Sequence, residues 1–297
     1  RGGGGAGMKT GTAKKQKKRS QASETWKRLR KNRLAVVGLV ILALIFLLAI
    51  FADVIAPYPY DQQDYSSTFQ TPSAQQLFGT DNFGRDILSR VIYGARISLQ
   101  IGFISLLGGA FVGCVLGAIA GYFGGAVDTI IMRFNDILMA IPRIVLAISI
   151  ASALGPGLTN AMIAVAISSI PNFARVVRAS TLTIKDQEYV EAAHCIGANN
   201  FHIIKRHVFP NVLAPIIVQA TLGIGTAIIL AASLSFLGLG VTPPDPEWGS
   251  MLSEARTYMR DYPYMVIFPG LAIMVTVLAL NLFGDGLRDA LDPKLKK

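Results

Sequence analysis

Long apolar segments with almost no charge constrain this chain more than any other feature of its sequence. Residues 97–123 contain no charged side chain. An α-helix needs about 20 apolar residues to cross the roughly 30 Å of hydrocarbon in a bilayer. The whole composition agrees, because 52% of the residues are hydrophobic, 15% are charged and the mean hydropathy is +0.47. We therefore predict an all-α membrane protein.

Six segments satisfy this length requirement, so the sequence predicts six transmembrane helices. They cover residues 34–52, 97–123, 137–154, 158–174, 212–232 and 264–283. The third and fourth are separated only by the Gly-Pro-Gly turn at 155–157, which predicts a hairpin of two spans. The fifth apolar run continues into residues 233–244, which fit a re-entrant or an interfacial segment.

The distribution of charge predicts the orientation in the membrane. Residues 8–33 hold eleven Lys or Arg and one acidic residue, whereas residues 34–297 hold sixteen basic and seventeen acidic residues. Basic tails stay in the cytoplasm, and an even number of spans places both termini there. Basic residues confined to a tail beside an apolar run also argue against a nucleic-acid partner. Residues 1–7 precede the first methionine and read as a cloning remnant.

This orientation assigns the connecting segments to the two sides of the membrane. Residues 124–136, 175–211 and the C-terminal tail 286–297 are predicted inside, and 53–96 and 233–263 outside. Within the basic tail, Trp26 and Leu29 lie among cations at 23–33. That pattern predicts a short helix on the anionic lipid surface, with a solvated, disordered tail as the alternative.

A stripe of small residues runs along the second span. Gly109, Gly113, Gly117 and Gly121 recur every four residues, and Ser105 extends the series. Small residues at this spacing let another helix approach closely. The stripe predicts tight helix packing, with a partner helix either in this chain or in another.

The spans lack a buried carboxylate of the kind that carries the coupling ion in secondary transporters and proton pumps. Asp53, Asp128 and Asp136 lie at span edges, where they reach water. Arg143, seven residues beyond Asp136, is predicted to snorkel inward, with a gating role as the alternative. The absence of such a carboxylate indicates that any energy this chain uses comes from a partner.

Residues 79–86, GTDNFGRD, have the G-x-x-x-x-G spacing of a phosphate loop. Arg85 and Asp86 stand where such a loop has Lys and Ser or Thr, so no nucleotide site is predicted. We expect a turn at Asp81 and Asn82 instead, followed by a short helix capped by Asp86.

The polar stretch 188–211 holds every histidine of the chain. It divides at Gly197 into two helical patterns, the second capped by Asn199 or Asn200 and stopped by Pro210. We predict that its apolar residues form one ridge across the turn, and that a ridge on a solvated loop is a docking surface. Val190 and Ala193 lie three residues apart before the turn. The residues of the ridge are Ile196, Phe201, Ile204 and Val208, flanked by Glu191, Lys205 and Arg206.

Metal binding and catalysis fit this stretch poorly. The spacings between His194, Cys195, His202 and His207 match no familiar ligand pairing. Adjacent helical residues point apart, which excludes His194 and Cys195 as a nucleophile pair. We predict no metal, cofactor or catalytic residue in this chain, and no disulfide between Cys195 and Cys114.

The same stretch resembles the EAA motif, E-A-A-x(3)-G-x(9)-I-x-L-P, of permease subunits of binding-protein-dependent ABC importers. Glu191, Ala192, Ala193, Gly197 and Pro210 match it position by position. His207 and Phe209 replace the Ile and Leu of the motif. The resemblance implies that the loop 186–210 is a coupling helix that seats in a groove of an ATPase subunit.

Three further stretches, 78–99, 235–249 and 281–294, resemble the C-type permease of the dipeptide, oligopeptide and nickel group. The resemblance implies a type I ABC importer permease fold. It divides the chain into a first transmembrane helix with an extracytoplasmic segment at 34–95 and a transmembrane domain at 96–285.

The resemblance also implies the partners. These are a homologous B-type permease, two ABC ATPases that hold ATP and Mg, and an extracytoplasmic binding protein. The outer segments 57–92 and 241–262 are rich in Tyr, Pro, Asp and Glu and are candidates for docking the binding protein, with ordinary solvated loops that pack on each other as the alternative. The complex would lie in a bacterial or archaeal plasma membrane and import peptides, with glutathione or a nickel chelate as alternative substrates. A stand-alone secondary transporter is the distant alternative.

Overall fold

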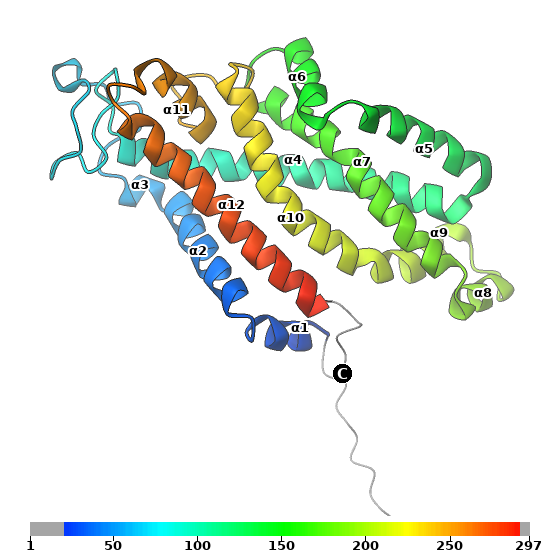
Figure 1. Ribbon diagram of the computed structural model, residues 1–297. Coiled ribbons are helices and arrows are strands. Elements are labelled where there is room, and N and C mark those ends of the chain that lie inside the picture. Colours follow the sequence, from blue (N-terminus) through cyan, green and yellow to red (C-terminus); the bar gives the residue numbers. More distant parts are fainter. Residues whose placement is uncertain (1–20, 292–297) are drawn as a thin grey trace, which may run out of the picture.

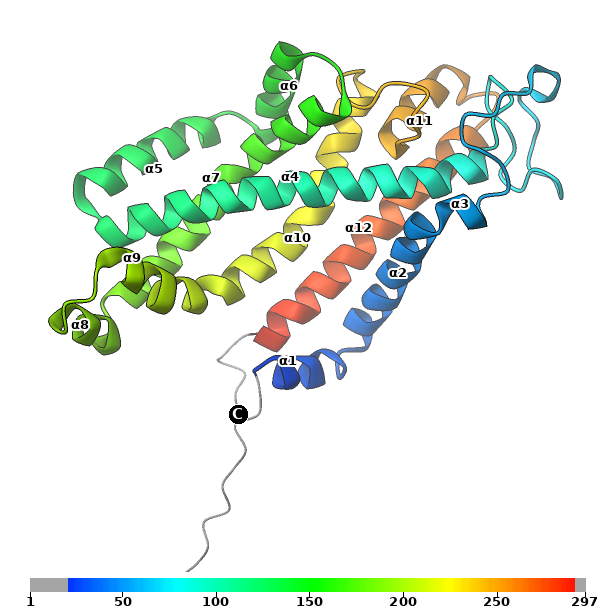
Figure 2. The ribbon, with the colours of Figure 1, turned by 180° about the vertical axis from the view of Figure 1, so that it is seen from behind.

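The computed structural model describes residues 21–291, and all its regular elements are helices (Figures 1 and 2). The long helices are α2 (Arg33–Ile50), α4 (Ile87–Phe123), α7 (Leu158–Lys185), α10 (Phe209–Phe236) and α12 (Tyr264–Leu291). The shorter ones are α1 (Gln21–Leu29), α3 (Ala52–Ile55), η1 (Tyr65–Ser67), α5 (Gly125–Ala140), α6 (Arg143–Leu154), α8 (Glu188–Cys195), α9 (Asn200–Ile203), η2 (Ile204–Val208), α11 (Trp248–Ala255) and η3 (Arg256–Tyr258). The predictions for residues 1–20 and 292–297 lie outside the described part.

In the described range, five helices are long and apolar enough to cross a membrane, and the pair α5 and α6 brings the number to six if it forms one bent span. The predicted all-α membrane fold is thereby confirmed. Residues 233–244 form no separate helix. They complete α10 and then turn through irregular backbone toward α11.

The third span differs from its prediction. We expected a loop at 124–136 and a straight helix at 137–154, but α5 is already helical from Gly125, and α6 follows it at an angle of 92°. Proline has no N–H to donate and disfavours a helical conformation in the residue before it. Pro142 therefore breaks the helix at Ile141, whose backbone is extended (ψ 128°).

Helix α4 connects the two ends of the molecule. The Asp86 carboxylate caps it by accepting a hydrogen bond from the Ser89 amide at 2.7 Å, as predicted. The helix then continues for 37 residues, or about 55 Å. The predicted short helix and the second span are thus one element. It runs from the end that holds α11 to the end that holds α8 and α9 (Figures 1 and 2).

The glycine stripe of α4 faces α7. A Cβ added at Gly109, Gly113, Gly117 or Gly121 would lie under 3.0 Å from an atom of α7. At Gly109 the nearest atom is the Ala166 carbonyl oxygen, at 2.5 Å. The partner of the stripe is therefore a helix of the same chain, and close approach is possible because these positions have no side chain.

The predicted short helix near the N-terminus is present as α1, and its end packs on α12. Leu29, Ala35 and Ala290 form a small apolar cluster of their own. This contact ties the start of the described chain to its end, and the alternative of a disordered segment does not hold for residues 21–29.

Candidate functional site

The stretch 186–210, called the docking loop below, forms a helix, a turn and a second helix, as predicted. Helix α8 ends before Gly197, and Asn199 caps α9 by accepting a hydrogen bond from the His202 amide at 2.7 Å. The turn requires glycine for its backbone, since Gly197 has φ +81°, a conformation that costs other residues energy. Space is not the reason, because a Cβ there would meet nothing within 4 Å.

Pro210 does not stop the second helix, contrary to the prediction. The π-helical turn η2 leads into α10, and residues Asn200–Phe236 form one apolar helical segment. The π-helical turn Ile204–Val208 lies directly before Pro210, and prolines and π-bulges distort a helix locally without ending it. The docking loop is thereby joined directly to a long helix of the bundle.

The apolar residues of the docking loop do not form one ridge. Val190 and Val208 are 0% exposed and face the bundle, whereas Ile196 is 84% and Phe201 73% exposed. The prediction failed because the Gly197 turn and the π-helical turn rotate the residues on their two sides away from a common face. The loop therefore has an inner face that packs and an outer face that offers Ile196 and Phe201.

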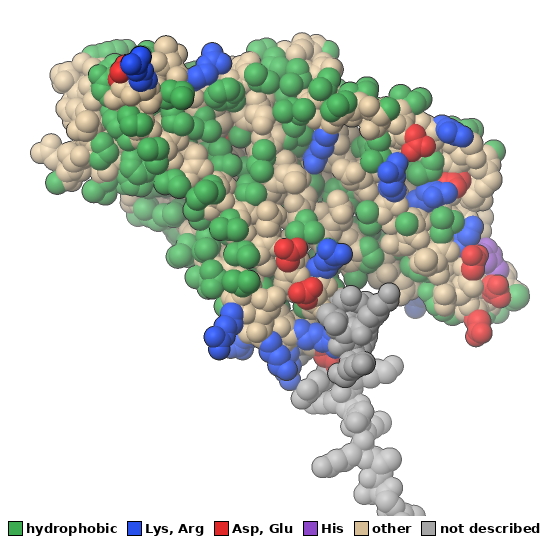
Figure 3. All heavy atoms as spheres, in the orientation of Figure 1, with side chains coloured by type: hydrophobic (Ala, Val, Ile, Leu, Met, Phe, Trp, Pro, Cys, Tyr) green, Lys and Arg blue, Asp and Glu red, His purple; other side chains and the backbone are tan. Residues whose placement is uncertain are grey.

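Most of the motif residues lie on the exposed part of this loop. Exposed positions are Glu191, Ala192, Gly197, Phe201, Lys205, Arg206 and Pro210, whereas Ala193 is buried. Figure 3 shows acidic, basic and histidine side chains gathered at this end of the molecule. Large apolar side chains exposed among charges are typical of a protein interaction site.

Polar contacts hold the docking loop against the rest of the chain. The Tyr122 hydroxyl, at the end of α4, donates to Asn200 Oδ1 at 3.0 Å and lies 3.1 Å from His194 Nε2. Asn211 Nδ2 lies 3.2 Å from the Tyr189 hydroxyl. Within residues 21–291, no group of three or more His, Cys, Asp or Glu is placed to hold a metal ion.

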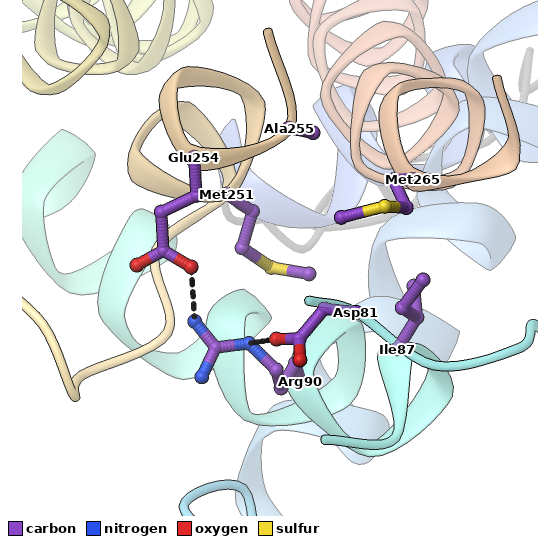
Figure 4. Close-up of a pocket in the computed structure, with 7 residues that line it drawn as sticks. All are labelled: Asp81, Ile87, Arg90, Met251, Glu254, Ala255 and Met265. Atoms are coloured by element: carbon purple, nitrogen blue, oxygen red, sulfur yellow. Dashed lines mark hydrogen bonds and ion pairs between the residues drawn. The ribbon is translucent and has the colours of Figure 1, made fainter. Parts of the chain in front are cut away.

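The opposite end, which we call the cap (residues 56–86 and α11), is built on buried charges. Arg85 Nη2 and Arg90 Nη2 lie 2.6 and 3.4 Å from Glu254 Oε2, and Arg85 Nε lies 2.5 Å from Asp81 Oδ2. Both arginines are at most 2% exposed. Arg90, Asp81 and Glu254 line a cavity of about 10 Å³, the size of one water molecule (Figure 4). The loop 79–86 thus builds structure, as predicted.

Arg143 is a further functional candidate, and its position differs from the one predicted from the sequence. Its Nη2 donates to Ser169 Oγ at 2.8 Å and its Nη1 to Thr226 Oγ1 at 3.2 Å. Both hydroxyls lie at least ten residues, about 15 Å, from either end of α7 and α10. The side chain therefore stays halfway along the spans instead of reaching inward. A charged side chain at the centre of a spanning helix costs about 2.5–3.5 kcal/mol.

The acidic side chains at the span edges have arginine partners. Arg96 Nη2 lies 3.0 Å from Asp53 Oδ2, Arg178 Nε 2.5 Å from Asp128 Oδ1, and Arg175 Nη2 3.1 Å from Asp136 Oδ1. The hydrogen bond from Arg96 lowers the pKa of Asp53. These pairs leave Arg143 without an ion pair among residues 21–291.

Comparison with known proteins identifies the family. A model described as binding-protein-dependent transport system inner membrane component matches residues 113–297. The chain belongs to this family. The N-terminal TM domain of oligopeptide transport permease C matches residues 20–72 of the same permease.

Two relatives resemble this permease over most of its length. The dipeptide transport system permease protein DppC of Alkalihalophilus pseudofirmus is 52% identical over 92% of this chain and 90% of its own. The glutathione transport system permease protein GsiD of Escherichia coli O157:H7 is 50% identical over the same shares.

Solved structures of ABC transporters share the fold. A chain of the inward-facing MetNI methionine ABC transporter superposes with a TM-score of 0.55 at 19% identity, covering 69% of this permease and 98% of that chain. An amino acid ABC transporter with histidines gives a TM-score of 0.52 at 15% identity, covering 68% and 94%. At these identities the likeness concerns the fold alone.

Proposed function

We propose that this permease forms half of the pathway through which peptides enter the cell, driven by ATP hydrolysis on partner subunits. A homologous permease supplies the other half, two ATPases bind ATP and Mg, and a binding protein delivers the substrate from outside. The observation that carries the proposal is the 52% identity to a dipeptide permease over 92% of the chain. This chain contributes the pathway and the mechanical coupling, and no catalytic group.

The proposal assigns the two ends of the molecule to the two sides of a plasma membrane. The docking loop and the tails 8–33 and 286–297 lie in the cytoplasm, and the cap lies outside. Residues 57–92 and 241–262, which include most of the cap, receive the binding protein. The domain 96–285 carries the pathway.

The docking loop couples ATP hydrolysis to transport through its two faces. Ile196 and Phe201 on the outer face enter a groove of the ATPase, where burial of apolar area supplies affinity. The charged residues Glu191, Lys205 and Arg206 lie around them and set the orientation of the loop.

Movement of the loop reaches the bundle by two connections. One is the unbroken helical segment Asn200–Phe236, and the other is the Tyr122 contact with the end of α4. When the ATPases close on ATP, they displace the loop as a unit and tilt α10 and α4. The pathway then opens toward the binding protein.

Purification and reconstitution test this function. We expect the tagged chain, extracted in mild detergent, to bring with it a second permease and ATPase subunits in stoichiometric amounts, as mass spectrometry of the complex would show. In liposomes with the binding protein, dipeptide uptake should require ATP. Uptake by this chain alone without ATP would instead identify a secondary transporter.

Competition measurements then decide the substrate. Glutathione is the second candidate because a glutathione permease is 50% identical, and a nickel chelate is the third by resemblance. We expect an unlabelled dipeptide to reduce labelled dipeptide uptake at lower concentration than glutathione or a nickel–peptide chelate does. Stronger competition by glutathione would reassign the substrate.

A further inference from the structure

Arg143 is a cation that the rest of the described chain does not neutralise. The acids nearest to it in sequence, Asp128 and Asp136, form ion pairs with Arg178 and Arg175. The two groups that accept hydrogen bonds from Arg143 are neutral hydroxyls. An ionisable side chain halfway through a membrane normally marks a pathway or a binding site.

The guanidinium keeps most of its hydrogen-bonding capacity unused. It has five N–H donors in a fixed fork, and two of them reach Ser169 and Thr226. Its Nε is buried and has no partner among residues 21–291. The hydroxyls of Ser169 and Thr226 donate their own hydrogens to the Val165 and Gly223 carbonyls at 2.8 Å. They therefore accept from Arg143 and hold the fork in place.

The start of α6 adds to the positive potential around Arg143. The N-cap residue is Pro142, and no side chain caps this end of the helix. The first amides of a helix carry a partial positive charge, and interrupted helices in transporters direct such ends at anionic groups of the substrate. The contacts of Arg143 with Ser169 and Thr226 place this helix start beside the middle of α7 and α10.

The site around Arg143 is accessible from the surface of this chain. Arg143 is half-buried, and Thr226 beside it is exposed. Helix α6 carries no charged side chain besides Arg143, α10 carries none, and the charges of α7 begin only at Arg175. An anion that passes along these helices would therefore meet Arg143 with little competition from other charges.

We propose that Arg143 and the first turn of α6 form a transient binding site for a carboxylate of the transported peptide, halfway across the membrane. The inference rests on the proposed function, because every unmodified peptide ends in a carboxylate. Arginine binds a carboxylate through two parallel N–H donors, a geometry that lysine lacks. Ser169 and Thr226 are positioning residues, since they hold the guanidinium and do not meet the carboxylate.

Uptake by the whole complex, reconstituted with its binding protein, tests the site with the variants Arg143→Gln and Arg143→Lys. The substrates are one peptide and its C-terminal amide, each at a concentration shown by calorimetry to load the binding protein. We expect Arg143→Gln to reduce uptake of the free acid about tenfold or more and uptake of the amide less than threefold, with Arg143→Lys between Gln and wild type for the acid.

Arg133→Gln is the matched control, because it removes the same charge from an exposed position on α5. This variant should change uptake of neither the free-acid peptide nor its amide. A second measurement does not require the binding protein to accept the amide. A peptide with a photoreactive group at its C-terminal residue should cross-link to this chain during turnover in the wild type and about tenfold less in Arg143→Gln.

Three results would overturn the inference in distinguishable ways. Equal losses for acid and amide, with unchanged cross-linking, would show that Arg143 does not bind the carboxylate. Loss of the homologous permease from the Arg143→Gln complex would show that Arg143 forms an ion pair with a carboxylate of that partner chain instead of with the peptide. Failure of the wild-type complex to import any peptide would reject the proposed function itself.

Discussion

The cap and the docking loop solve opposite problems at the two ends of α4. At the cap, Arg85, Asp81 and the neighbouring Arg90 of α4 are buried away from solvent, and both arginines pair with the partly exposed Glu254. The docking loop does the reverse and exposes the apolar side chains Ile196 and Phe201. Buried paired charges hold one arrangement, because losing a partner is costly, whereas exposed apolar side chains gain free energy only when another surface covers them.

The largest expected effect is in the cap. Arg85→Ala removes a positive charge that pairs with the carboxylates of Asp81 and Glu254. Breaking a buried ion pair in this way costs about 3–5 kcal/mol. We expect a marked loss of thermal stability of the detergent-solubilised chain, measured by the temperature of its unfolding transition. Arg260→Ala, an exposed arginine at the same end, should change stability by less than about 0.5 kcal/mol. Equal effects of both variants would contradict the role of the cap network.

The glycine stripe that joins the two ends comes next. Gly109→Ala places a methyl group 2.5 Å from the Ala166 carbonyl oxygen, so α4 and α7 have to separate. Overpacking of this kind costs about 1–3 kcal/mol. The neighbouring Gly108→Ala is the control, since its Cβ would lie 3.7 Å from the Ala166 Cβ, an ordinary contact. Unfolding measurements should separate the two variants, and the packing interpretation fails if Gly108→Ala is as destabilised.

Substitutions on the inner face of the docking loop should affect stability, whereas substitutions on its outer face should affect binding of the ATPase. Val190→Ala removes buried methyl groups and should cost about 2 kcal/mol of stability. Phe201→Ala should leave stability within about 0.5 kcal/mol and weaken ATPase-subunit binding about tenfold or more, as for an interface residue worth more than about 1 kcal/mol. Binding of purified ATPase to the reconstituted permease measures the second effect. Wild-type binding by Phe201→Ala would show that the outer face is not the docking surface.

The smallest effect concerns an exposed ion pair next to the cap. Because Arg96 lowers the pKa of Asp53, the pair adds stability at pH values above the ordinary pKa of about 3.9 and loses it as the pH falls through the lower folded-state value. We expect Asp53→Asn to reduce thermal stability slightly at pH 7, with the difference from wild type closing below about pH 4. A difference from wild type that does not shrink as the pH falls below about 4 would exclude this linkage.

Signals that act over a few residues were predictable from the sequence. The Asp86 cap, the glycine turn at 197 and a cap at Asn199 or Asn200 were all expected, because each depends on backbone groups within three residues. The third span shows the limit of the same reasoning. Pro142 is a local helix breaker, yet it lies inside an apolar run that satisfied the length of a span, and hydropathy outweighed it in the prediction.

The sequence by itself determined that this chain is helical, where its apolar runs begin and end, and which motif links it to the importer permeases. These properties depend on composition and short spacing, which no distant contact changes. Only the tertiary structure decided which face of the docking loop is exposed, that the glycine stripe meets α7, and where the Arg143 guanidinium points. Those outcomes depend on which helices lie side by side, since Arg143 is held by hydroxyls 26 and 83 residues away in sequence.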